Sequence, residues 1–135
     1  MMAIARAAGS RSRDATTRVG AVVAGPDWRV LGTGYNGGPR GSLESLPNAG
    51  SVRHAFTIHA EVNALLQAID ARSLDLSRCT LFSTHAPCGS CIRLAAHLGI
   101  CSIIWDVFEL DEAQNAEASL VAETLHIDVR ALNDA

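Results

Sequence analysis

One histidine and two cysteines in this sequence have side-chain types and a spacing suited to holding a zinc ion. His59 opens a His-Ala-Glu segment, and Cys88 and Cys91 belong to Pro-Cys-Gly-Ser-Cys. A catalytic zinc typically has three nitrogen or sulfur ligands from the protein and leaves its fourth position to water. Glu61 lies close enough along the chain to take a proton from such a water and pass it on. These residues predict Zn²⁺ as cofactor and Glu61 as a general acid/base.

A structural zinc site is the alternative interpretation of the same ligands. Such a site needs a fourth protein ligand, which Cys79, His85 or a more distant histidine would have to supply. Glu61 would then only stabilise a helix start, an effect worth about 1 kcal/mol at most on an exposed surface. The carboxylate beside the ligands favours the catalytic interpretation. Cys79 and Cys101 begin apolar, strand-like segments and are predicted to be small core residues.

Length and composition indicate a globular protein of one domain. The chain has 135 residues, and we expect residues 1–135 to form a single domain with one hydrophobic core. The hydrophobic share of 48% and charged share of 19% are typical of globular proteins. There is no apolar run of membrane-spanning length and no secretory signal, so we expect a cytoplasmic protein without membrane contact. The net charge of −3 makes nucleic acid an unlikely partner.

The order of apolar and turn-forming segments predicts an α/β fold. The expected elements, in chain order, are a short helix up to Ala8, a loop over 9–17, strands over 19–24 and 28–35, a loop over 36–41, an irregular segment over 42–55, a helix from a Thr57 cap to about Ala71, a strand over 79–83, a helix over 88–97, a strand over 100–105, a helix over 112–125 and a strand over 127–131. A hairpin followed by helix–strand alternation predicts a three-layer α-β-α sandwich with a mixed five-stranded sheet. Both halves of the predicted metal site fall at helix N-termini, where ligand sites of such folds concentrate.

Several segments resemble the cytidine/deoxycytidylate deaminase superfamily. The segments 57–64 (TIHAEVNA) and 87–91 (PCGSC) are similar to its zinc motif, and 18–22 (RVGAV) and 34–41 (GYNGGPRG) look like its deoxycytidylate deaminase branch. The resemblance runs from about Arg11 to Trp105. It implies a cytidine deaminase-like fold and hydrolysis of the 4-amino group of dCMP, giving dUMP and ammonia. It also implies a homo-oligomer, commonly a hexamer, with dCTP and dTTP as effectors in many members.

The resemblance further implies roles for residues around the substrate. Glu61 would protonate N3 of the base and then the departing amine, and the backbone N–H groups of Ala60 and Cys88 would contact the base or the tetrahedral intermediate. Asn36 is expected at the sugar or base, and Tyr35 at the pocket or between subunits. The candidates for the 5′-phosphate are Ser12, Arg11, Arg13, Arg18 and Arg40. Some relatives bind a second, structural zinc between positions 41 and 54, but this chain has no cysteine there, so we expect one zinc per chain.

Other functions remain open on the sequence alone. A deaminase of the same superfamily could act on cytidine, on a modified dCMP or on adenosine in tRNA, although the last needs a basic face that the net charge of −3 does not suggest. A free-nucleoside substrate would leave the loop over 9–17, which carries Arg11 and Arg13, without a role. A non-catalytic zinc module for assembly belongs to a different class and would not need Glu61.

Overall fold

A five-stranded sheet forms the centre of the molecule. The computed structural model describes residues 1–42, 51–70 and 75–134. The strands are β1 (Gly20–Ala24), β2 (Val30–Tyr35), β3 (Thr80–His85), β4 (Ser102–Phe108) and β5 (Asp128–Ala131), in the spatial order β2-β1-β3-β4-β5. Strand β1 is antiparallel to β2 and β3, whereas β3, β4 and β5 run parallel. The predicted mixed sheet is confirmed.

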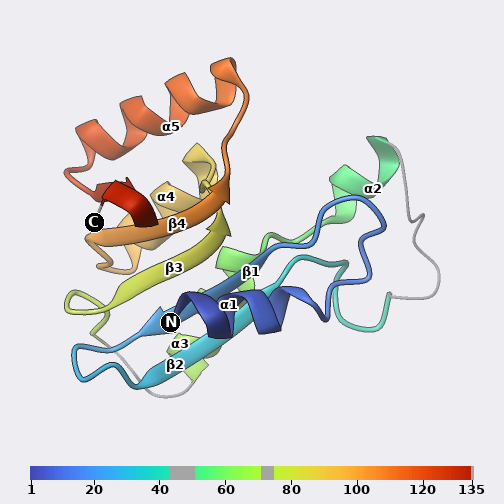
Figure 1. Cartoon of the computed structure of the whole chain (residues 1–135), viewed down its shortest axis with the longest axis horizontal. Helices are drawn as coiled ribbons and strands as arrows, with labels where there is room; N and C mark the ends of the chain where they lie inside the picture. The colour runs from blue at the N-terminus through green and yellow to red at the C-terminus, as the bar shows by residue number, and fades with distance from the viewer. Residues whose placement is uncertain (43–50, 71–74, 135) are drawn as a thin grey trace.

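Helices cover both faces of the sheet and complete the three predicted layers (Figure 1). They are α1 (Met2–Gly9), α2 (Ser51–Phe56), α3 (Ala60–Asp70), α4 (Gly89–His97), α5 (Glu112–Thr124) and the short 3₁₀ helix η1 (Leu132–Asp134). Strand residues alternate between the faces: Val22 and Phe82 pack in the smaller core under α1, whereas Val23 and Leu81 pack in the larger core with α3, α4 and α5. The parallel strands are joined by α4 and α5, because a parallel connection needs a crossover.

Two glycines of β2 allow α3 to lie directly against the strand. At Gly32 and Gly34 a Cβ atom would overlap the carbonyl oxygens of Ala64 and Ala60, respectively. Helix α3 presents small buried residues on this side, among them Ala60, Ala64 and Ala68. This close approach fixes the start of α3, and therefore the segment around His59, relative to the sheet.

Side chains of α3 also pair with the exposed edge of β2. Asn63 Nδ2 donates to the Tyr35 carbonyl at 2.9 Å, and the Thr33 N–H donates to Gln67 Oε1 at 3.0 Å. Unpaired edge groups invite strand addition from another chain. The two amides satisfy edge groups that an added strand would otherwise use.

The structure corrects several local predictions. Residues 51–56 form α2 inside the segment expected to be irregular, while the breakers expected at 47–50 lie outside the described residues. Thr57 does not cap a helix: its hydroxyl donates to the Arg53 carbonyl at 2.9 Å, and α3 begins only at Ala60. Trp28 lies in the β1–β2 turn with φ of 61° instead of in the strand. Cys79 is buried as predicted, but Cys101 is exposed.

No helix among the described residues combines the length and apolar character required to span a bilayer.

Candidate active site

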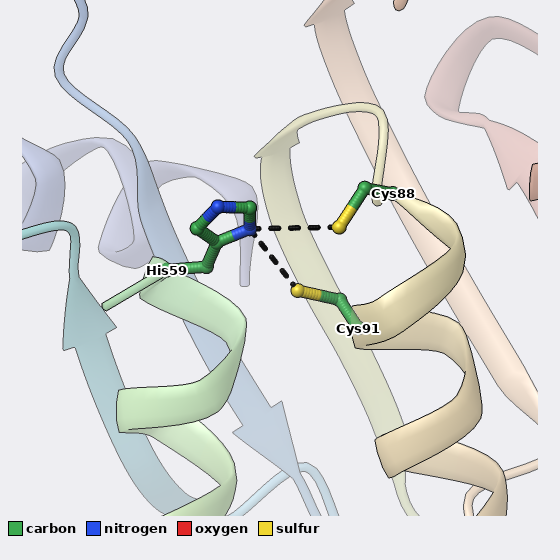
Figure 2. Close-up of side chains that lie close together, drawn as sticks. All are labelled: His59, Cys88 and Cys91. Atoms are coloured by element: carbon green, nitrogen blue, oxygen red, sulfur yellow. Dashed lines mark hydrogen bonds between the residues drawn. The ribbon is translucent and has the colours of Figure 1, made fainter. Parts of the chain in front are cut away.

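The three predicted zinc ligands meet between the starts of α3 and α4 (Figure 2). His59 directly precedes α3, and its carbonyl accepts the N–H of Asn63 at 3.2 Å as the helix begins. Cys88 is the N-cap of α4, and Cys91 lies in its first turn. The Nδ1 atom of His59 lies 3.6 Å from Cys88 Sγ and 3.4 Å from Cys91 Sγ. Helix N-termini favour negative charge, so this position suits thiolates.

These separations fit a tetrahedral zinc ion. With zinc–sulfur bonds of about 2.3 Å and zinc–nitrogen bonds of about 2.0–2.1 Å, a tetrahedral angle places nitrogen and sulfur about 3.5 Å apart. All three donor atoms lie within 4.8 Å of one another, and no other group of metal-binding side chains is found among the described residues. His85 and Cys79 lie outside this group, so the described residues supply three ligands, the number typical of a catalytic zinc.

The donor set is also electrostatically prepared for a cation. A hydrogen bond from Cys91 lowers the pKa of Cys88 to about 3. The hydrogen bond to Cys88 raises the pKa of His59, and the same thiol pairing together with burial raises the pKa of Cys91. These shifts favour a proton on His59 and a proton on Cys91 in the absence of the metal. A zinc ion would displace these protons as it binds.

Glu61 is buried at the inner end of the site. Its side chain accepts a hydrogen bond from Ser83 Oγ at Oε1 (3.0 Å), and its Oε2 lies 3.8 Å from Cys91 Sγ. Burial raises the pKa of Glu61, while the nearby His59 and the Ser83 hydrogen bond lower it. A carboxyl group whose pKa is moved up toward neutrality can both accept and donate a proton.

A cavity of about 210 Å³ opens beside Glu61. Cavities for drug-sized ligands are typically about 300–1,000 Å³, so this one suits a single heterocyclic base with other groups at its mouth. The cavity is lined by the segment before β1, the C-terminal ends of β2 and β3, helix α2, and the residues around the starts of α3, α4 and α5. The lining residues are Asp14, Thr17, Val19, Asn36, Arg53, His54, Thr57, His59, Ala60, Glu61, His85, Ala86, Cys88, Leu110 and Gln114.

Of the predicted substrate contacts, Asn36, Ala60 and Cys88 line this cavity. The amide of Asn36 is engaged with the chain before β1: it accepts the Val19 N–H and donates to the Thr17 carbonyl, both at 2.8 Å. Ser12 is buried and donates to the Asn36 carbonyl at 2.8 Å. Asn36 therefore forms part of the cavity wall, and Ser12 supports its backbone without lining the cavity.

The remaining predicted contacts lie outside the cavity. Tyr35 and Arg40 line a separate cavity of about 470 Å³ between β2 and α3. The guanidinium of Arg11 lies over the Tyr35 ring, 5.7 Å from its centroid, and Arg18 Nε donates to the Asp14 carbonyl at 3.4 Å. The structure does not bring these arginines together at the metal site.

Sequence reasoning missed two basic side chains of the cavity, the arginine Arg53 and the histidine His54. Both belong to α2. Arg53 Nη1 lies 2.7 Å from Asp14 Oδ1, and Asp14 also accepts the N–H groups of Thr16 and Thr17 at 2.8 Å. The adjacent Arg53 and His54, a few residues before the ligand His59, were the sequence feature that could have indicated a role at the site. They were missed because α2, the helix that orients them, follows a stretch rich in turn-forming residues.

Comparison with known proteins identifies the family. The family model described as "Cytidine and deoxycytidylate deaminase zinc-binding region" matches residues 1–107, which include all three ligands and Glu61. The chain belongs to this family. It is therefore a hydrolase of the deaminase class with Zn²⁺ as its cofactor, in agreement with the His59, Cys88 and Cys91 donor set.

Individual relatives carry the deoxycytidylate deaminase name. The Mus musculus deoxycytidylate deaminase is 29% identical over 131 residues, covering 92% of this chain and 70% of that protein. The deoxycytidylate deaminase of Mycobacterium phage D29 is 37% identical over 118 residues, covering 77% of this chain and 89% of that protein. A solved dCMP deaminase from cyanophage S-TIM5, in complex with dCMP and dUMP, has 26% identity and a TM-score of 0.75 over 97% of this chain and 93% of that one.

Proposed function

We propose that this protein deaminates dCMP to dUMP and ammonia. The observation that carries the proposal is a buried carboxylate, Glu61, beside three zinc ligands at the inner end of a base-sized cavity with an arginine, Arg53, in its wall. The relatives named deoxycytidylate deaminase support the choice of nucleotide.

The chemistry follows from the donors around the cavity. Bound zinc supplies a Lewis acid that activates water at neutral pH. Glu61 would take one proton from the attacking water, whose oxygen bonds to C4 of cytosine, and deliver that proton to N3. The same carboxylate would then take the second proton from the hydroxyl group on C4 and deliver it to the amine. The C4–N bond breaks as the C4 carbonyl forms, and ammonia leaves a uracil ring. Ala60 lines the cavity at the start of α3, and its backbone N–H is the donor that we assign to the base.

We assign the 5′-phosphate to the mouth beside Arg53 and His54. Both line the cavity, and the ion pair with Asp14 holds the Arg53 guanidinium in place. Arginine suits phosphate because its planar fork donates two parallel hydrogen bonds. This assignment replaces Arg18 and Arg40, which lie elsewhere, as the first candidates for the phosphate.

Ammonia release from dCMP, deoxycytidine, CMP, cytidine and 5-methyl-dCMP tests the proposal with zinc-loaded protein. A charge-assisted phosphate contact is worth about 1.5–3 kcal/mol, so kcat/KM for dCMP should exceed that for deoxycytidine by roughly ten- to hundredfold per contact. Arg53→Gln should reduce this preference, whereas Arg93→Gln, an exposed residue of α4, should leave it unchanged. Equal kcat/KM for dCMP and deoxycytidine would instead identify a nucleoside deaminase.

Assembly is a separate proposal. We infer that the chain forms a homo-oligomer, a hexamer by family resemblance, through the face of α3 that exposes Leu66 and Ile69 beside the cavity holding Tyr35 and Arg40. Light scattering with and without dCTP or dTTP tests both the assembly and the proposed response to these effectors; a monomeric mass in every condition would contradict it.

A further inference from the structure

Ser83 is a polar residue on the apolar side of β3. The strand alternates, so Leu81 and Ser83 face α3 while Phe82 packs in the core under α1. Ser83 has an exposed fraction of 0%, and its hydroxyl reaches across to Glu61. A buried hydroxyl is costly unless it is hydrogen-bonded, and an apolar residue would fill the same position at no such cost. Its presence next to Glu61 therefore calls for a role beyond packing.

Ser83 Oγ links the backbone of β3 to the side chain of Glu61. The His85 N–H donates to Ser83 Oγ at 3.4 Å, at the place where the β3–β4 register shifts between Ser83 and His85. Ser83 Oγ in turn donates its own proton to Glu61 Oε1 at 3.0 Å, because the ionised carboxylate that acts as the base can only accept. The other carboxyl oxygen, Oε2, is left on the side of Cys91 and the metal ligands.

We propose that Ser83 is a positioning residue for Glu61: it holds Oε1 so that Oε2 faces the metal and the substrate. This role rests on the proposed function, in which Glu61 transfers the protons. A glutamate side chain has three rotatable bonds, and a misplacement of about 1 Å at a reacting group can cost about 10²-fold in rate. Ser83 restricts that freedom from the centre of the sheet without touching the substrate, since it is absent from the cavity lining.

Two pairs of variants isolate the hydroxyl. Wild type and Ser83→Ala form one pair, and Ser83→Thr and Ser83→Val form the other, whose members have nearly the same shape. In each pair, the member without a hydroxyl should have a kcat lower by roughly ten- to hundredfold. This factor corresponds to about 1.5–3 kcal/mol, the range for a hydrogen bond to a charged group. KM and the amount of bound zinc should stay unchanged. If the variants with the larger side chains, Ser83→Thr and Ser83→Val, fail to fold, wild type and Ser83→Ala decide the result on the same criteria.

Equal kcat within the pairs would overturn the proposal. So would loss of zinc in the variants without the hydroxyl, because Ser83 would then serve metal retention instead of Glu61.

A second measurement does not depend on activity. Urea unfolding of the metal-free protein gives a double-mutant cycle from Ser83→Ala, Glu61→Ala and the double variant. Coupling between the two substitutions is expected, and strictly additive effects would overturn the contact itself. If wild type shows no dCMP turnover while the cycle shows coupling, the proposed function fails but the placement of Glu61 by Ser83 stands.

Discussion

Glu61 and Glu112 occupy comparable positions in their helices but very different surroundings. Each lies in the first turn, Glu61 in α3 and Glu112 in α5. Glu112 is exposed, whereas Glu61 is buried with an exposed fraction of 4%. A helix N-terminus stabilises either carboxylate by a modest amount. Burial is what raises the pKa of Glu61, against the opposing effect of the nearby His59.

Glu61→Gln should therefore keep the metal and lose the reaction. Glutamine preserves size and an acceptor for Ser83 but cannot transfer protons, so kcat should fall by about 10²–10⁴-fold with zinc content unchanged. Stopped-flow or coupled ammonia assays, together with elemental analysis, measure both quantities. Glu112→Gln is the matched control and should retain wild-type turnover. A Glu61→Gln variant with about half of the wild-type kcat would disprove the catalytic assignment.

At the level of elements, the contact between β2 and α3 determines where the catalytic residues lie. Gly34 has no Cβ, so the strand approaches the α3 backbone at Ala60, the residue between His59 and Glu61. Gly34→Ala should push the start of α3 away from the strand. The free energy of unfolding should fall by about 1–3 kcal/mol, as at other overpacked sites, and kcat should fall as well. Gly37→Ala is the control, because a Cβ there meets no atom within 4 Å. Urea unfolding and turnover are measured for both variants. Equal stability and equal kcat of Gly34→Ala and Gly37→Ala would contradict this account.

The same elements show what the sequence could and could not predict. The sheet and the metal ligands were predictable because they depend on local patterns: short, mostly apolar runs over 19–24 and 79–83, and ligands placed at helix starts. The phosphate candidates were not, because the Asp14–Arg53 pair joins residues 39 positions apart and depends on how α2 packs. Ser83 had a visible signal, a polar residue at an inward position of an apolar strand, but its partner became identifiable only once β3 lay against α3.

On the scale of the whole molecule, the metal site joins two parts of the chain that the sheet brings together. His59 enters from the β2–α3 side and the cysteines from the β3–α4 side (Figure 2). A ligand that binds only the folded protein stabilises it according to its concentration, by about 2.7 kcal/mol at one hundred times its dissociation constant. Zinc should therefore raise the thermal stability of the entire fold and not only that of the site.

Removal of zinc by a chelator should lower the Tm, and zinc addition should restore it. Since zinc requires deprotonated ligands, protons compete with the metal, and the zinc-induced rise in Tm should be larger at pH 8 than at pH 6. Differential scanning calorimetry with and without chelator at the two pH values measures this difference. Cys91→Ala should abolish most of the rise, whereas Cys101→Ala, which removes an exposed cysteine outside the site, should keep it. If Cys101→Ala lost the response and Cys91→Ala retained it, the metal would lie elsewhere, and Glu61 would have no activated water from which to take a proton.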